Sequence, residues 1–265
     1  MKQESNIRDT KTTVPALDKV MAILGELEAH GPSLAGELIS ALGLPKSSTY
    51  TLLDAMKQHK LITQDSQGRY RLWLRLLALG QAASASLDRR DVARRHLLRL
   101  MEDTGLLCHF GIMDGPAAYY ILKVESRGSI SVRSYEGKTL SLSRSGVGKC
   151  LLAWQPEEER ERLLRELDFT AATPASITNA ADLRAELERI RRCGWALDNG
   201  EDVPGVRCVA APVFGLNGTV MGAISVVGAR MQMEDERLEG LAQRVMACAT
   251  DISREFGCAT PPSAL

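Results

Sequence analysis

The sequence lacks a net charge of either sign, so gross basicity gives no argument for nucleic-acid binding. Lys and Arg equal Asp and Glu at 33 each, and the first 75 residues carry ten basic against eight acidic side chains. Any basic surface that binds a phosphate backbone must therefore be local. Aromatic residues are also scarce, at 5%, so stacking on single-stranded bases is not expected as the main binding mode.

Long apolar runs are absent as well. No stretch approaches the roughly 20 apolar residues that a membrane-spanning helix needs, and the polar start, MKQESNIRDTKTT, has no apolar segment of a secretory signal. We therefore expect a cytoplasmic protein with no membrane partner. The six cysteines form no CxxC pair, which favours reduced thiols over a disulfide framework or a zinc module. No cofactor is expected.

Residues 14–75 follow the order of a winged helix-turn-helix domain, after a polar tail at 1–13 that is expected to be disordered. Apolar residues recur at three- and four-residue intervals along the first helix. Ser33 is placed to cap a second helix, Gly43 to make the turn, and Pro45 to begin a third. The predicted elements are helices over residues 14–30, 33–41 and 45–58 and hairpin strands over 61–64 and 69–72.

The third helix has two chemically different faces. Leu52, Leu53 and Met56 are expected to be buried, and the other face carries small polar and basic side chains. A helix laid in the major groove of DNA needs this division. Its first residues suit phosphate contacts, its middle can reach base edges, and two hairpin arginines form a wing. The predicted DNA-binding residues are Lys46, Ser47, Ser48, Tyr50, Thr51, Arg69 and Arg71. A three-helix protein-interaction module of the same shape is the alternative.

Residues 76–103 are expected to form a linker helix, whose repeated arginines mark either a solvated face or a surface that packs in a dimer. Beyond Gly105 the hydrophobic period changes, and residues 104–258 indicate an α+β domain around a largely antiparallel sheet, followed by a tail at 259–265. The predicted strands cover 107–113, 118–124, 130–135, 207–214 and 219–227, and the predicted helices 147–154, 157–167, 180–192 and 234–256.

Two features of the α+β domain suggest chemistry. Residues 145–150, SGVGKC, approach a phosphate loop but lack the glycine required at Ser143 and the hydroxyl required at Cys150, so nucleotide hydrolysis is not expected. The segment is then either a turn into a helix whose free N–H groups suit a carboxylate, or a tight turn without a ligand. Cys208 with His109 is conceivable as a thiol nucleophile and its base, although a strand cysteine is more often a small hydrophobe.

The chain resembles the IclR family of transcriptional regulators from about Val14 to Gly257. The resemblance rests on LPKSS at 44–48, GWALDNGE at 194–201 and CVAAPVF at 208–214. It implies a winged helix domain, a linker helix and a GAF-like effector domain, in proteins that form dimers or dimers of dimers. Many members repress genes for the uptake or breakdown of sugar acids and aromatic acids. Thr51 departs from the usual Arg of the family, and Val227 from a second pocket Ser of some members.

We therefore expect a DNA-binding transcriptional regulator that is not an enzyme. It would bind a pseudo-palindromic double-stranded operator as a homodimer or a dimer of dimers. It would repress a carbon-source catabolic or uptake operon under the control of a small organic acid. The alternative is a small-molecule hydrolase or transferase that uses Cys208, with the N-terminal module as a dimerisation unit.

The resemblance also implies where the effector binds. Backbone N–H groups at Gly146 and Val147, at a helix start, can hold a carboxylate without a formal cation. Asp198, expected on a facing loop, can accept a hydroxyl proton from the ligand, which together suggests a hydroxylated acid such as a sugar acid. The predicted effector-binding residues are Gly146, Val147, Asp198, Cys208 and Ser225, with Arg133 and Arg144 as candidates for further carboxylate contacts.

Overall fold

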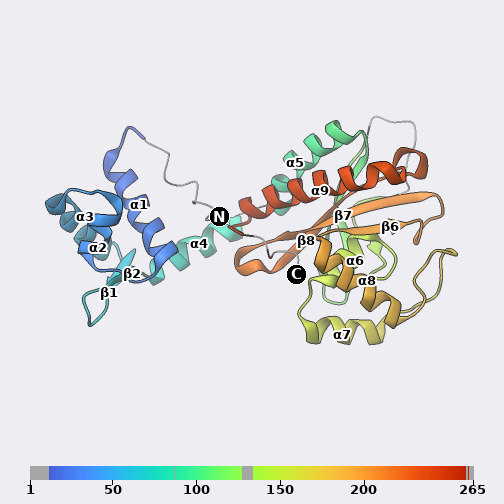
Figure 1. Cartoon of the computed structure of the whole chain (residues 1–265), viewed down its shortest axis with the longest axis horizontal. Helices are drawn as coiled ribbons and strands as arrows, with labels where there is room; N and C mark the ends of the chain where they lie inside the picture. The colour runs from blue at the N-terminus through green and yellow to red at the C-terminus, as the bar shows by residue number, and fades with distance from the viewer. Residues whose placement is uncertain (1–11, 87, 127–133, 261, 263–265) are drawn as a thin grey trace. The chain divides into compact units, whose positions relative to one another are not determined.

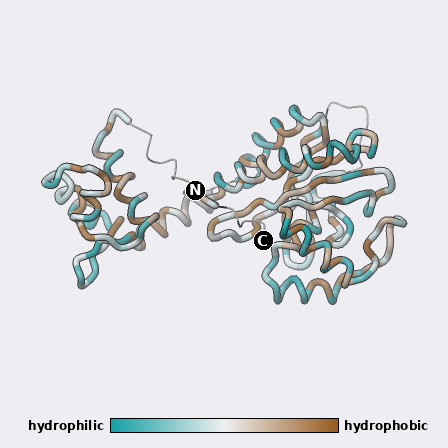
Figure 2. The backbone as a smooth tube through the Cα atoms, in the orientation of Figure 1, coloured by the Kyte–Doolittle hydropathy of each residue, from teal (hydrophilic) through white to brown (hydrophobic). Residues whose placement is uncertain are grey.

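The computed structural model describes residues 12–86, 88–126, 134–260 and 262. The chain divides between residues 87 and 88 into two compact units, shown in Figure 1. Along the helices of both units, hydrophobic and hydrophilic residues alternate around the axis (Figure 2), as expected for helices that bury one face. Among the described residues, no helix is long and apolar enough to cross a membrane.

The N-terminal unit is a three-helix core with a hairpin and a following helix. Leu38 and Leu53 are fully buried between the helices, and Tyr70 of the hairpin closes the same core. Gly43 adopts the left-handed conformation at the turn, with a φ of 61°. The elements are α1 (Pro15–His30), α2 (Ala35–Leu42), α3 (Lys46–Gln58), β1 (Ile62–Gln64), β2 (Tyr70–Leu72) and α4 (Leu74–Ser86).

The start of α2 differs from the sequence-based expectation, because Ser33 does not cap it. Leu34 is the N-cap residue, and its backbone N–H donates to the Glu37 carboxylate at 2.7 Å. Ser33 instead exchanges two backbone hydrogen bonds with Tyr70, at 3.0 and 2.8 Å. A backbone bridge satisfies two polar groups at once and ties the hairpin to the helical core. Pro45 likewise is the N-cap of α3 rather than its first residue.

The C-terminal unit is built on a six-stranded, fully antiparallel sheet with the order β5-β4-β3-β8-β7-β6. Helices α5 and α9 pack on one face, and α6, which contacts α8, packs on the other, as Figure 1 shows. The elements are α5 (Arg89–Thr104), β3 (Leu107–Asp114), β4 (Ala117–Val124), β5 (Thr139–Leu140), α6 (Gly146–Ala153), α7 (Glu157–Glu166), α8 (Ala180–Cys193), β6 (Ala196–Asn199), β7 (Val206–Phe214), β8 (Val220–Ala229) and α9 (Asp235–Glu255), with short 3₁₀ turns at Leu216–Gly218 and Arg230–Gln232.

The expected α+β class and antiparallel sheet are confirmed. Two short strands, β5 and β6, were not predicted. Of the strand expected at 130–135, residues 130–133 lie outside the described residues. In the stretch where one linker helix is expected, the structure has two helices: α4 ends at Ser86 and α5 begins at Arg89. Asp88 caps α5 by accepting the Arg90 N–H at 2.8 Å.

Candidate functional site

The exposed face of α3 carries every side chain predicted there to contact DNA. Lys46, Ser47, Ser48, Tyr50 and Thr51 are all exposed, while Leu53 and Met56 are buried on the opposite face. Leu52 is only partly buried, and Thr49, which the sequence did not single out, is 1% exposed. No side chain caps the helix at Pro45. Its first backbone N–H groups therefore remain available for an anion.

Two hydroxyls on this face are already oriented by the helix itself. The Ser48 hydroxyl donates to the Pro45 carbonyl at 3.2 Å, and the Thr51 hydroxyl donates to the Ser47 carbonyl at 3.3 Å. A hydroxyl whose proton is used in this way still offers lone pairs. The Thr51 oxygen can therefore accept a hydrogen bond from a group outside the helix.

The hairpin presents its two arginines away from the core. Arg69 and Arg71 are exposed on either side of the buried Tyr70. Its turn is fixed by Asp65, whose carboxylate accepts the Gln67 and Arg69 N–H groups at 2.9 Å each. The Arg71 guanidinium also lies 5.2 Å from the centre of the Trp73 ring, a cation–π distance. The wing is thus a short, braced hairpin with two cations outward.

The predicted effector residues come together on the sheet face that α6 covers. Antiparallel neighbours that pair directly lie on the same face of a sheet. Asp198 of β6 pairs with Cys208 of β7, and Cys208 pairs with Val227 of β8. The expectation that Asp198 lies on a facing loop is therefore wrong, because it occupies an edge strand beside Cys208. Ser225 lies two residues before Val227, on the same face. We call this surface the effector face.

The start of α6 packs directly onto the effector face. A Cβ atom at Gly146 would lie 2.9 Å from the Cys208 Sγ atom and 3.3 Å from its carbonyl oxygen, so only glycine allows this approach. The Val147 N–H and the Ser225 hydroxyl both approach the Cys208 thiol and oppose the rise of its pKa. Ser145 caps the helix, accepting the Gly148 N–H at 2.9 Å and donating to the Ser141 carbonyl at 2.7 Å. The helix start and the strand cysteine form one rigid contact.

A buried lysine in α6 organises the carboxylates around this contact. Lys149 is 1% exposed, and its Nζ atom lies 2.6 and 2.8 Å from the two Glu201 carboxylate oxygens and 2.6 Å from the Leu197 carbonyl. Glu186 lies 3.5 Å away on α8. A buried cation is stable only when its donors are matched in this way. From the sequence, Lys149 was noted only as part of a segment that does not match a phosphate loop.

The acidic group on the effector face has a strongly shifted pKa. Burial raises the pKa of Asp198 to about 7, and the Glu201 and Asp202 carboxylates add to the rise. The Glu201 N–H, which donates to Asp198 at 2.7 Å, and Lys149 oppose it. Near neutral pH this side chain therefore both accepts hydrogen bonds as a carboxylate and donates them as an acid.

The thiol of Cys208 is held in its protonated, weakly nucleophilic form. Burial, followed by the Asp198 carboxylate, raises its pKa to about 12, and the thiolate is the reactive form of cysteine. Ser225, whose hydroxyl approaches this thiol, is fully buried, and the hydroxyl has no hydrogen-bond partner of normal geometry within the described residues. The six cysteines are all free thiols.

Of the two arginines named as further carboxylate partners, Arg144 is within the described residues. Arg144 lies 3.4 Å from the Asp202 carboxylate and donates to the Thr170 carbonyl at 3.0 Å, so it is engaged with protein groups. Arg133 lies outside the described residues.

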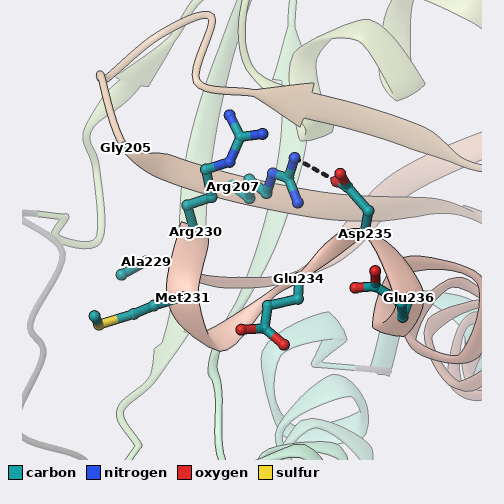
Figure 3. A pocket seen from close by; sticks show the side chains of 8 residues that line it. All are labelled: Gly205, Arg207, Ala229, Arg230, Met231, Glu234, Asp235 and Glu236. Carbon is teal, nitrogen blue, oxygen red and sulfur yellow. Dashed lines mark ion pairs between the residues drawn. The ribbon is translucent and has the colours of Figure 1, made fainter.

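Two surface depressions lie elsewhere on this unit. One is lined by Arg207, Asp235 and their neighbours (Figure 3). Its cation is bound by Asp235 at 2.6 Å, the Met233 carbonyl at 2.6 Å and Asn199 at 2.7 Å, so Arg207 fixes strand β7 to the start of α9. The other includes Trp154, Arg160 and Arg191. None of the predicted effector residues lines either depression.

Comparisons with known proteins agree over nearly the whole chain. The family model for the IclR helix-turn-helix domain matches residues 16–66, and that for the bacterial transcriptional regulator IclR C-terminal domain matches residues 81–254. The chain is 50% identical to the HTH-type transcriptional regulator RhmR of Escherichia coli, over 94% of this chain and 95% of that protein. It is 31% identical to the HTH-type transcriptional repressor AllR of Escherichia coli, over 93% and 92%. The crystal structure of the Thermotoga maritima IclR superposes with a TM-score of 0.63 at 30% identity, over 92% of this chain and 99% of that one.

Proposed function

Because the chain belongs to the IclR family of bacterial transcriptional regulators, we propose that it represses a carbon-source catabolic or uptake operon and that a small organic acid controls its binding to the operator. The observation that carries the DNA-binding half is the face of α3, where five exposed polar or basic side chains stand opposite a buried apolar face. The relative AllR is named as a repressor, which supports repression rather than activation. A regulator of this kind acts where the DNA is, in the cytoplasm.

In this proposal α3 lies in the major groove and the hairpin contacts the flanking backbone. Lys46, Ser47 and the uncapped N–H groups at the helix start hold phosphates. Tyr50 and Thr51 reach base edges, with Thr51 as an acceptor because its proton is used within the helix. Arg69 and Arg71 bind phosphate from the wing.

The effector proposal follows from the chemistry of the effector face. A carboxylate placed at the start of α6 replaces the weak Cys208 contact of the Val147 N–H with a charge-assisted hydrogen bond. Asp198, with a pKa near 7, accepts a hydrogen bond from a hydroxyl of the same ligand as a carboxylate, or donates one to it as an acid. This pairing favours a hydroxylated acid. The alternative of an enzyme that uses Cys208 is not favoured, since the matched relatives are named as regulators and the thiol is protonated.

The proposal includes a dimer on a pseudo-palindromic operator, because one winged domain covers only a half-site. Helix α4 supports this idea with three strongly exposed leucines, Leu74 at 63%, Leu77 at 56% and Leu79 at 51%. Exposed apolar side chains gathered on one short helix are typical of a protein contact surface.

A gel shift with the upstream DNA of the protein's own gene tests the proposal. We expect specific retardation at about 150 mM salt, where non-specific affinity is weak, and release by an organic acid. Lys46→Ala should weaken all sites similarly and lower the salt slope by about one, because a phosphate contact carries little sequence information. Arg192→Ala, an exposed cation on α8, is the matched control and should leave binding unchanged. Unaltered operator affinity in Lys46→Ala would show that α3 is not the DNA-binding helix.

A further inference from the structure

Two buried polar atoms on the effector face belong to residues that pair directly on neighbouring strands. His109 of β3 pairs directly with Ser225 of β8. His109 is 1% exposed and Ser225 is fully buried. Within the described residues, neither the Nδ1 atom of His109 nor the Oγ atom of Ser225 has a hydrogen-bond partner of normal geometry; the Ser225 hydroxyl only approaches the Cys208 thiol, which is a weak acceptor. An unpartnered buried polar atom is unfavourable by about 1–3 kcal/mol, so two at one position call for an explanation.

The imidazole of His109 is held rigidly and is uncharged. Its Nε2 atom lies 2.7 Å from the Ser134 hydroxyl, and its ring stacks on Tyr120 with centroids 4.0 Å apart. Burial, with Lys123 and Lys138 adding to the effect, lowers the pKa of His109 to about 3. The ring is thus neutral at physiological pH, with one nitrogen donating and the other accepting. Its bond to Ser134 fixes the direction in which Nδ1 points.

We propose that His109 Nδ1 and Ser225 Oγ together bind a hydroxyl group of the effector. The proposal rests on the proposed effector function and adds a second polar subsite to the carboxylate site at the start of α6. A hydroxyl fits both atoms because it donates one hydrogen bond and accepts others. Rigid, desolvated groups that bind in place contribute more than mobile ones, since little order is lost on binding.

The register of the sheet sets the distance between the two subsites. A Cβ atom at Gly146 would lie 3.5 Å from the Cβ atom of Ala210 on β7. Ala210 pairs directly with Ser225 of β8, and Ser225 pairs directly with His109 of β3. Neighbouring strands lie roughly 4.8 Å apart, so a group held between Ser225 and His109 is about one and a half strand spacings, or roughly 7 Å, from β7. In an extended carbon chain this is about the separation of a carboxylate and a hydroxyl four carbons further along. The subsite therefore selects an acid with a hydroxyl distant from its carboxylate.

The test compares pentanoate, 5-hydroxypentanoate and 2-hydroxypentanoate by thermal shift and isothermal titration on the full chain. The wild type should bind 5-hydroxypentanoate about tenfold more tightly than pentanoate, as expected for two neutral hydrogen bonds. Ser225→Ala should lose this preference while still binding pentanoate. Equal binding of 5-hydroxypentanoate and pentanoate by the wild type would overturn the subsite alone. If none of these acids, nor gluconate, raises the melting temperature, the effector proposal itself is overturned.

Two substitutions at His109 separate ligand recognition from a structural role. His109→Asn keeps a polar atom near the Nδ1 position and loses the Ser134 contact, whereas His109→Gln keeps a polar atom near Nε2 and loses the one at Nδ1. Recognition by Nδ1 predicts that Asn retains more of the preference for 5-hydroxypentanoate than Gln does. A structural role predicts the reverse order, with Gln the closer to wild type, and that result would overturn the proposal. Ser225→Ala removes a single atom and gives the same answer should either histidine variant fold poorly.

Discussion

At the scale of single residues, the protonation of Asp198 connects the effector face to pH. Its pKa is about 7 in the folded protein, against about 3.8 for an exposed aspartate, so the native state binds this proton more tightly than the unfolded state. The contribution of Asp198 to stability is therefore complete below about pH 4 and is lost as the pH rises through about 7. The carboxylates of Glu201 and Asp202 work against the charged form, and Lys149 favours it.

This linkage predicts that Asp198→Asn stabilises the C-terminal unit at high pH. At pH 8 the melting temperature of the variant should exceed that of the wild type. Between pH 5 and pH 8 the advantage of the variant in free energy of unfolding should grow by at most about 3 kcal/mol. Calorimetry across this range measures it. Asp103→Asn, which removes an exposed charge on α5, is the control and should change little. A constant difference between pH 5 and pH 8 would mean that Asp198 is not the titrating group.

Residues of the site were predictable to different degrees. Gly146, Val147, Asp198, Cys208 and Ser225 were named through the family resemblance, and the structure places all of them at one face; their roles in binding stay predictions. His109 was weighed only as a base for a thiol. Its relation to Ser225 depends on which strands pair and in which register, and nothing in the local sequence around either residue contains that information.

Lys149 illustrates the same limit. A lysine in a short helix is normally exposed, and its burial follows from carboxylates that the β6–β7 loop and α8 bring to it. The signal that was present in the sequence is the small-residue run before it, which allows α6 to approach the sheet closely.

At the scale of elements, the approach of α6 to β7 makes Gly146 a sharp test of the effector site. Gly146→Ala places a Cβ atom 2.9 Å from the Cys208 Sγ atom, so the helix start must shift. We expect a loss of stability of about 1–3 kcal/mol and a loss of acid binding, with operator affinity in the absence of acid retained. Thermal unfolding and titration measure both effects.

Gly240→Ala in α9 is the matched control for this substitution. A Cβ atom there meets nothing within 4 Å, and replacing a helical glycine in open space should stabilise the unit by about 0.5–1 kcal/mol. If Gly146→Ala behaves like Gly240→Ala and binds acids normally, the start of α6 is not part of the site.

Elements with a clear hydrophobic periodicity were predictable from the sequence, and very short elements were not. The helices and the hairpin follow amphipathic or alternating patterns, and their observed bounds lie within a few residues of the expected ones. Strand β6 has four residues and β5 has two, too few for an alternation to stand out. Ser33 was wrongly expected to cap α2 because its backbone is used by Tyr70, a partner that only the folded chain brings near.

At the scale of the whole molecule, the fold class and the family were predictable because long motifs in both units fix them. The α+β class and the IclR resemblance are confirmed by the two family models and by the similar solved structure. The division between the units was less accessible, since helical residues stand on both sides of residue 87 and hydrophobic patterning alone does not separate them.

The assembly of the molecule gives the last prediction. If α4 is a dimer surface, Leu74→Ser with Leu77→Ser should shift the protein from dimer toward monomer at micromolar concentration, because two strongly exposed leucines lose the apolar area that they would bury. Operator affinity should fall with it, since a monomer reads one half-site where the dimer reads two. Light scattering and gel shift on the same samples measure both quantities. Leu216→Ser removes a leucine that is 63% exposed in the C-terminal unit and should alter neither. A double variant that remains dimeric would place the dimer contact on another surface, and a wild-type monomer with full operator affinity would remove the dimer from the proposal.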